Sequence, residues 1–270
     1  MLRTEQRNPR TTHIDKMETS EMLRIIHEEN LRSVEAVGEA LDSVAQAVDA
    51  VANAFQNGGR LIYVGAGTSG RIAVADAAEC PPTYGVDYNT VIALIAGGEG
   101  ALVKASENAE DLGTRGREDL LARGATSRDV VMGISAAGGA EYVASAMRAA
   151  KELGCVTISL SSNSPTLIGD LADIAIFTDT GAEVITGSTR MKAGNAQKMV
   201  LNMITTCAMI KTGKVYENLM INLRPTNVKL KARMVGMVCD TCGVDGEKAL
   251  ALLEANDFSL RRVLEAQGKV

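Results

Sequence analysis

A glycine-rich loop and an acidic residue beyond it are the groups of this sequence best suited to chemistry. The loop is Gly65–Gly70, with the sequence GAGTSG, between a short apolar run and the start of a predicted helix. Glycines let backbone approach a ligand closely, and a helix N-terminus favours an anion. Since Thr68 and Ser69 add hydroxyl donors, we predict a phosphate site here. Glu79, which ends the same predicted helix before Pro81-Pro82, is the first candidate for acid–base chemistry.

The loop also matches the dinucleotide fingerprint G-x-G-x-x-G, which by itself is a weak signal. A dinucleotide site needs an acid at the end of the second strand. Here Ile95 is followed by Ala96 and two glycines, and Glu99 lies beyond them. Hydroxyl groups in the turn suit a phosphate monoester, which presents more oxygens for hydrogen bonds. We therefore favour a sugar phosphate over a dinucleotide.

Two further segments carry groups that suit phosphate binding. Residues 135–140 contain a serine and two glycines after a third apolar run, and residues 181–192 place hydroxyl and cationic groups before a predicted helix. Ser188 or Thr189 could instead be the N-cap of that helix, and a cap does not require the cations that follow. The predicted substrate-binding residues are Gly67, Thr68, Ser69, Gly70, Ser135, Gly138, Gly139, Ser188, Thr189, Arg190 and Lys192.

The elements that must position these loops are short apolar runs separated by helical patterns, which indicate a parallel sheet covered on both faces. Strands are predicted at 61–64, 91–96, 130–134, 155–160 and 174–177, and helices near 70–79, 100–112, 140–152, 164–171 and 191–210. One helix is predicted to begin at Thr19 or Ser20 as N-cap, and a second to cover 34–55. Three short helices are predicted near 227–240, 244–255 and 258–266.

The predicted fold class is α/β, a doubly wound five-stranded parallel sheet with N-terminal helices and a small C-terminal helical bundle. If the strand order is 2-1-3-4-5, the loops after strands one and three face each other at the point where ligands bind in such sheets. The predicted domains are an N-terminal segment with helices (1–58), a sugar-phosphate domain (59–215) and a C-terminal helical appendage (216–270).

Composition excludes several classes of function. A net charge of −5 and a pI of about 5.3 argue against nucleic acid or an anionic membrane as partner. His13 and His27 are the only histidines and both precede the predicted sheet, so histidine catalysis and a histidine-ligated metal lose support there. The pair Cys239 and Cys242 is a lone CxxC in a predicted helix, which favours packing over zinc or redox chemistry. No apolar run is long enough for a membrane helix, and five cysteines do not indicate a disulfide framework, so we expect a cytoplasmic protein.

The order of these motifs resembles the N-acetylmuramic acid 6-phosphate etherases of the sugar isomerase (SIS) fold group. The glycine loop is shared by many folds, whereas Glu79-Cys80-Pro81-Pro82 and the segment 187–194 are specific. The matching segments are Thr4–Asn8, Gly65–Arg71, Glu79–Thr83, Ile95–Glu99, Glu107–Asp111, Glu183–Gln197, Gly213–Met220 and Thr226–Leu230.

The resemblance implies cleavage of the ether that joins D-lactate to C3 of an amino-sugar phosphate. It implies Glu79 as the general acid that protonates the ether oxygen and Glu110 as the general base at C2. Burial of Glu79 beside the crevice would keep its carboxyl protonated. On the residue pattern alone, Glu110 could belong to a solvated helix face, and Glu99 is a competing acid. The resemblance further implies a homodimer with sites near the interface, and no metal or organic cofactor.

The third-strand loop departs from the family pattern, which has a Ser-Gly-Arg-Thr-Pro-Tyr run where this chain has Ala137–Tyr142. The hydroxyls and the arginine are missing, and Glu141 adds a negative charge. Ser135 and the backbone amides of the loop could substitute for them. The departure keeps two alternatives open, a sugar-phosphate isomerase of the same fold and a non-catalytic sugar-phosphate sensor.

Overall fold

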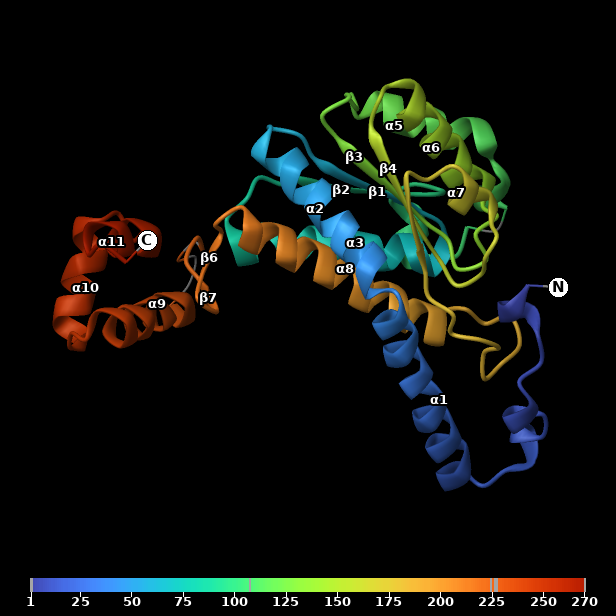
Figure 1. Ribbon diagram of the computed structural model, residues 1–270. Helices are drawn as coiled ribbons and strands as arrows, with labels where there is room; N and C mark the ends of the chain where they lie inside the picture. The colour runs from blue at the N-terminus through green and yellow to red at the C-terminus, as the bar shows by residue number, and fades with distance from the viewer. Residues whose placement is uncertain (1, 107, 224, 226–227, 270) are drawn as a thin grey trace. The chain divides into compact units, whose positions relative to one another are not determined.

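Five apolar runs of the chain form one parallel sheet in the computed structural model, which describes residues 2–106, 108–223, 225 and 228–269. The strand order is β2-β1-β3-β4-β5, so the predicted doubly wound five-stranded sheet and its order are confirmed (Figure 1). The strands are β1 (Leu61–Gly65), β2 (Val91–Ile95), β3 (Val130–Ile134), β4 (Val156–Ser161) and β5 (Ile174–Phe177). β1, β2 and β3 are buried almost throughout, because helices cover both faces.

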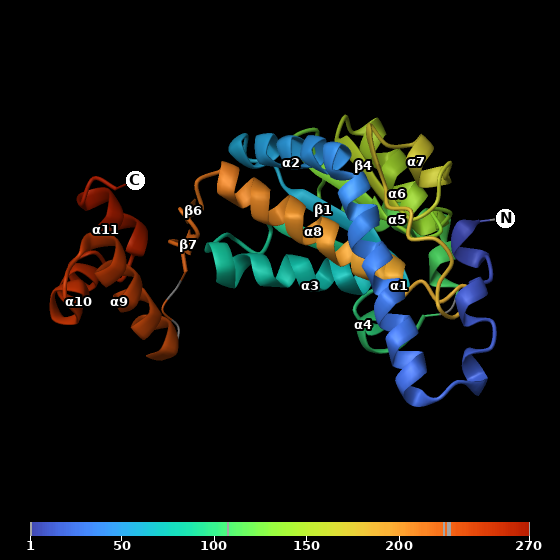
Figure 2. The same ribbon diagram turned by 60° about the horizontal axis from the view of Figure 1, so that its bottom comes forward.

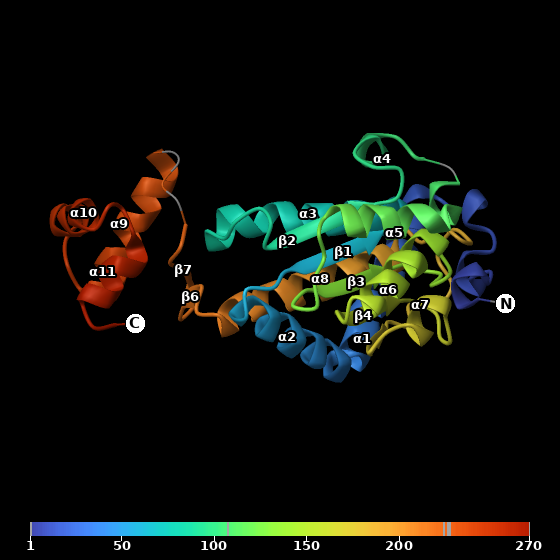
Figure 3. The same ribbon diagram turned by 90° about the horizontal axis from the view of Figure 1, so that it is seen from above.

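The helices form a layer on each face of the sheet. On one face lie α5 (Gly113–Ala122), α6 (Glu141–Glu152) and α7 (Leu167–Asp170), and on the other lie α2 (Leu41–Gln56), α3 (Gly67–Tyr84) and α8 (Lys192–Lys211) (Figures 1 and 2). Leu94 of β2 belongs to one buried cluster with Leu120 of α5 and Met147 of α6. The short helices α4 (Gly100–Val103) and η4 (Ala109–Asp111) lie on the connection from β2 to α5 (Figure 3).

The N-terminal residues form three short 3-10 turns and then a long helix. The turns are η1 (Arg3–Glu5), η2 (Pro9–Thr11) and η3 (Ile14–Lys16), and the helix is α1 (Thr19–Glu39). The predicted N-cap at Thr19 or Ser20 is wrong, because Glu18 occupies the cap position and makes no side-chain cap bond. The single helix predicted over 34–55 is also wrong, because the chain breaks at Ala40 between α1 and α2. The apolar spacing runs on across this break and therefore gives no sign of it.

Two helices differ from prediction near the candidate site. α3 continues through Pro81 and Pro82 to Tyr84, since the φ angle of proline is itself close to helical and only the backbone donors are lost. α5 was not predicted, because its sequence has few apolar positions. It packs through Gly116, where a Cβ would lie 1.8 Å from the carbonyl oxygen of Tyr142. A glycine contact of this kind leaves no hydrophobic periodicity in the sequence.

The chain divides into two compact units. The first comprises Met1–Ala78 with Asn89–Ala208, and the second comprises Glu79–Tyr88 with Met209–Val270. The second unit contains the short antiparallel strands β6 (Val215–Tyr216) and β7 (Leu219–Met220), and the helices α9 (Val228–Cys242), α10 (Gly246–Ala255) and α11 (Leu260–Ala266). Among the described residues, none of these helices or those of the first unit is long and apolar enough to cross a membrane.

The second unit has its own apolar core. Met234, Val238 and Leu253 are fully buried in it together with residues of α11. Cys239 and Cys242 pack against this core, partly buried, and all five cysteines of the chain are free thiols.

Candidate functional site

The loop between β1 and α3 is folded so tightly that two of its glycines are required. A Cβ on Gly65 would lie 2.7 Å from the backbone nitrogen of Gly70, and a Cβ on Gly70 would lie 2.6 Å from Cγ1 of Ile95. The next glycine, Gly67, has a φ of +55°. The loop therefore brings the first turn of α3 to the carboxyl end of β1, where its unpaired N–H groups and helix dipole favour an anion.

A cavity of about 180 Å³ lies directly beside this loop. Gly67 and Arg71 line it from the loop side, and Ser106, Asn108 and Glu110 line it from the connection that follows β2. The structure thus brings the predicted phosphate loop and the predicted base to one cavity. Their convergence follows from the sheet order, which sets β2 next to β1.

Arg71 is a site residue to which the sequence analysis gave no role. It lines the cavity, and its Nε donates a hydrogen bond to the carbonyl oxygen of Leu102 at 3.2 Å. This bond ties the start of α3 to the far side of the cavity and leaves further guanidinium N–H groups available to an anion. Its place immediately after Gly70 was the available signal.

The segment before α8 meets the glycine loop. A Cβ placed on Gly194 would lie 3.6 Å from Cγ2 of Thr68 and 3.5 Å from the carbonyl oxygen of Thr189. Ser188 and Thr189 are half-buried, whereas Arg190 is exposed. Two of the predicted binding segments are therefore neighbours, although more than a hundred residues separate them in the sequence.

A buried carboxylate caps α8. Glu183 accepts hydrogen bonds from the backbone nitrogens of Lys192 and Ala193, each at 3.0 Å. Burial raises the pKa of Glu183 above its ordinary value, and the two N–H donors only partly oppose this shift. Glu183 lies in the predicted binding segment but was not assigned this structural task.

Lys192 forms a buried ion pair with α1. Its Nζ lies 2.6 Å from Oε2 of Glu29, and the two side chains are 3% and 9% exposed. Asn8 and Arg10 of the N-terminal segment also donate to Glu29, at 2.7 and 3.0 Å. Burial by itself would raise the pKa of Glu29, but Lys192, Asn8 and Arg10 outweigh it, so the pKa lies below its ordinary value. Lys192 is thus a predicted ligand whose cation already has a partner.

The N-terminal segment is bonded to the strand of chain that leads to Ser188. Thr11 donates through its hydroxyl to the carbonyl oxygen of Val184 at 2.8 Å, and Asn8 donates to that of Ala182 at 3.3 Å. The backbone nitrogen of Gly187 donates to Thr4 at 3.3 Å. These contacts hold the binding segment from outside the sheet and give the polar first residues a structural role.

The loop after β3 is held by its own hydrogen bonds. Ser135 is buried and accepts from the backbone nitrogen of Gly138 at 3.1 Å, while Gly139 is exposed. Gly138 has a φ of +80°, and a Cβ there would lie 2.4 Å from Thr166. The amide of Gly138 is therefore already used. Glu141, whose charge seemed unfavourable beside an anion, is paired with Arg148 at 3.1 Å.

The two predicted catalytic carboxyl groups differ in setting from the expectation. Glu79 was expected to be buried at the end of α3, but it is exposed, because α3 continues beyond it. Glu79 belongs to the second unit and Glu110 to the first. Glu107, Thr226 and Asn227, which belong to motifs that carried the family resemblance, lie outside the described residues.

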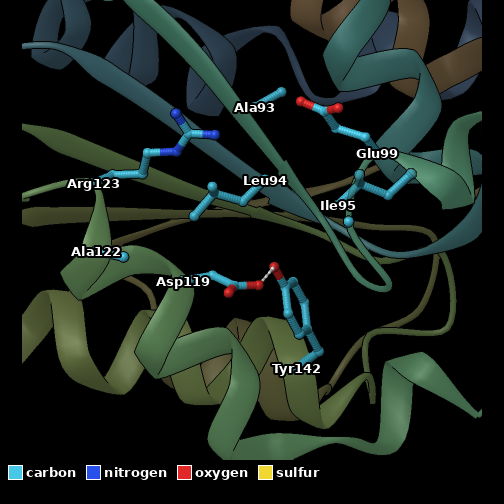
Figure 4. Close-up of a pocket in the computed structure, with 9 residues that line it drawn as sticks. Ala93, Leu94, Ile95, Glu99, Asp119, Ala122, Arg123 and Tyr142 are labelled. Carbon is cyan, nitrogen blue, oxygen red and sulfur yellow. Dashed lines mark hydrogen bonds between the residues drawn. The ribbon is translucent and has the colours of Figure 1, made fainter.

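Glu99, the competing acid, lies in a different cavity of about 370 Å³. That cavity is lined by β2 and α5, and Figure 4 shows Arg123 and the hydrogen-bonded pair of Asp119 and Tyr142 in it. Ala96, by contrast, lines the cavity of the glycine loop. The structure therefore separates Glu99 from the glycine loop and keeps Glu110 beside it. Among the described residues, no three His, Cys, Asp or Glu side chains form a group that could hold a metal ion.

Fold and site together define a protein of the SIS class. Residues 43–151 match the family model of the glucokinase regulatory protein N-terminal SIS domain. The structure of a phosphoheptose isomerase from Francisella tularensis has the same fold, with a TM-score of 0.53 at 22% identity over 73% of this chain and 100% of that chain.

Two curated relatives identify the family within this class. The chain is 51% identical to N-acetylmuramic acid 6-phosphate etherase of Cronobacter sakazakii and 49% identical to that of Salmonella choleraesuis. Each match covers 96% of this chain and 87% of the relative. The chain belongs to the N-acetylmuramic acid 6-phosphate etherase family, so the resemblance seen in its motifs is confirmed.

Proposed function

We propose that the protein cleaves the D-lactyl ether of N-acetylmuramic acid 6-phosphate, giving N-acetylglucosamine 6-phosphate and D-lactate. The observation that carries the proposal is the shared cavity of Gly67 and Glu110. It places a carboxylate beside a loop built for a phosphate, as a sugar phosphate substrate requires. The etherase name of relatives at about half identity supports the choice of substrate.

Glu110 acts as the base in this proposal. In the open-chain aldehyde the C2 proton is acidic because it lies next to a carbonyl group. The Glu110 carboxylate takes that proton, the bond between C3 and the lactyl oxygen breaks, and a double bond forms between C2 and C3. Water then adds at C3 and a proton returns to C2, so the sequence of elimination and hydration balances without a redox step.

Glu79 supplies the proton to the departing lactyl oxygen. An alkoxide is a poor leaving group, so protonation by a carboxylic acid lowers the barrier. A carboxyl group that acts as an acid near neutral pH needs shielding from water. Because Glu79 is exposed in the single chain, we infer that substrate or a second subunit covers it during the reaction.

The phosphate is held by groups from three segments. Gly67, Thr68, Ser69 and Gly70 supply the turn, its hydroxyls and the N-terminus of α3, Ser188, Thr189 and Arg190 approach from the start of α8, and Ser135, Gly138 and Gly139 border the neighbouring strand end. The contact between Thr68 and the segment at Gly194 supports the joint action of the first two segments. Lys192 serves them by anchoring the second segment to Glu29.

The reaction can be tested by incubation with N-acetylmuramic acid 6-phosphate in heavy water, with lactate and deuterium at C2 as readouts. The wild type should release lactate and label C2. Glu110→Gln should abolish exchange, whereas the neighbouring Asp111→Asn, which does not line the cavity, is the matched control. Glu79→Gln should retain some exchange and release little lactate.

Each alternative gives a distinct result. An isomerase would exchange C2 of a hexose phosphate and form a ketose without lactate. A sensor would bind the sugar phosphate and neither exchange nor cleave it. Normal exchange by Glu110→Gln would refute the assignment of the base.

We also propose a homodimer with sites near the interface. α1 exposes Leu23, Leu31 and Val34, an apolar set that a second subunit would cover. Leu31→Glu should shift the protein toward a monomer in sedimentation velocity, while Glu35→Gln on the same helix should not. A dimer unchanged by Leu31→Glu would place the interface elsewhere. The free state of all five cysteines supports the cytoplasm as the compartment.

A further inference from the structure

The cavity of about 370 Å³ beside β2 has no role in the proposed reaction. Its volume lies in the usual range of small-molecule sites, about 300–1,000 Å³. Its polar groups are of opposite sign, with the guanidinium of Arg123 at the end of α5 and the carboxylate of Glu99 before α4. Figure 4 shows these two side chains on opposite sides of β2, with Asp119 and Tyr142 below the strand.

Both charged groups are available to a ligand. Within the described part of the chain, neither Arg123 nor Glu99 makes an ion pair. Asp119 and Tyr142 are engaged, because the tyrosine hydroxyl donates to the carboxylate at 2.8 Å and Arg115 lies 3.3 Å from the other oxygen. Burial, with the nearby Asp119, raises the pKa of Tyr142, so the phenol stays neutral and adds no charge to the cavity.

The wall between the two charges is the edge of the sheet. β2 stands at the end of the strand order and pairs with β1 on one side. Alternate N–H and C=O groups of an edge strand point away from its partner and can bond to a ligand. Ala93, Leu94 and Ile95 line the cavity in succession, so this backbone edge faces it.

From these features we propose that the cavity is a second ligand site, which binds a small amino-sugar phosphate carrying both a phosphate and a free ammonium group. Arg123 takes the phosphate, since a guanidinium forks onto two of its oxygens. Glu99 takes the ammonium, and the edge of β2 bonds to the sugar hydroxyls. The substrate and product of the proposed reaction carry an N-acetyl group and lack this ammonium, so the site distinguishes its ligand from both.

One short segment separates this site from the cavity of the glycine loop. Gly98 and Glu99 line the second cavity, while Ala96 and Ala101 line the first. The same connection continues to Glu110. A ligand held by Glu99 therefore acts on the wall that carries the proposed base, and it should change the KM of ether cleavage. This coupling, unlike the binding itself, rests on the proposed function.

Isothermal titration calorimetry with glucosamine 6-phosphate tests the binding. The titration is run with the glycine-loop site saturated by N-acetylglucosamine 6-phosphate, so that heat reports the second site. Glucose 6-phosphate lacks the ammonium and glucosamine lacks the phosphate, and each should bind at least about tenfold more weakly. Arg123→Gln and Glu99→Gln should each weaken glucosamine 6-phosphate binding by about tenfold or more.

Arg117→Gln and Glu152→Gln are the matched controls, since these residues pair with each other on the exposed surface away from the cavity. They should bind as the wild type does. Circular dichroism confirms that each variant is folded. The proposal fails if glucosamine 6-phosphate does not bind, or if both cavity variants bind it like the controls. It also fails if sedimentation shows that Arg123→Gln and Glu99→Gln instead abolish association between copies, which would make this edge a protein interface. Binding without any change in KM would leave the site intact and refute the coupling.

Discussion

Replacement of Lys192 by methionine decides whether this lysine anchors the binding segment or contacts the phosphate. Its ammonium lies 2.6 Å from Glu29 in a buried setting. Loss of one partner of a buried ion pair typically costs about 3–5 kcal/mol. Because Asn8 and Arg10 still donate to Glu29 in the variant, we expect a loss near the lower end, about 3 kcal/mol.

The assay is urea unfolding followed by far-ultraviolet circular dichroism, with thermal unfolding beside it. For a chain of this size, about 3 kcal/mol corresponds to a fall in Tm of roughly 6–12 °C. The double variant Glu29→Gln with Lys192→Met should recover most of the loss, because it leaves no unpaired buried charge. Lys198→Met, an exposed lysine on the same helix, is the control for the loss of a charge.

The pH dependence gives a second readout. The pKa of Glu29 is lowered in the folded state, so its ionic bonds stabilise the fold above the ordinary value of 4.5, and this stabilisation is lost as pH falls through the folded pKa. The difference between wild type and Lys192→Met should therefore narrow below about pH 4.5. A variant of normal stability with a strongly raised KM would refute the anchoring role and make Lys192 a phosphate ligand.

Three further changes test other parts of the site. Gly70→Ala forces a Cβ within 2.6 Å of Ile95 and should destabilise the protein by about 1–3 kcal/mol in calorimetry, and a normal Tm would mean that the turn is looser than described. Tyr142→Phe removes the hydroxyl bonded to Asp119 and should cost about 1 kcal/mol in urea unfolding, and no loss would mean that water replaces this bond. The pKa of Glu183 is raised by burial, so in the wild type its contribution to stability falls as pH rises above 4.5. Glu183→Gln should abolish this fall in pH-dependent unfolding, and a persistent fall would assign it to another group.

The fold could be predicted because its signals are local. Each strand is a short apolar run, and burial on both faces is visible in the run itself, as at Val130–Ile134. The glycine loop is equally local, since a turn with close backbone contacts admits no side chain at Gly65 or Gly70. α5 was not visible, because it packs through Gly116 against the backbone of α6 and needs few apolar side chains to do so.

Of the candidate site, the sequence by itself determined the loop and the carboxyl groups, because residue type and spacing carry that chemistry. Only the tertiary structure decided which carboxyl group meets the loop. The neighbouring positions of β1 and β2 bring Glu110 to Gly67, and the glycines after β2 lead Glu99 into another cavity. Burial and pairing were likewise beyond the sequence, since the partner of Lys192 lies 163 residues away. Contacts of that kind depend on how the whole chain packs, and no local pattern records them.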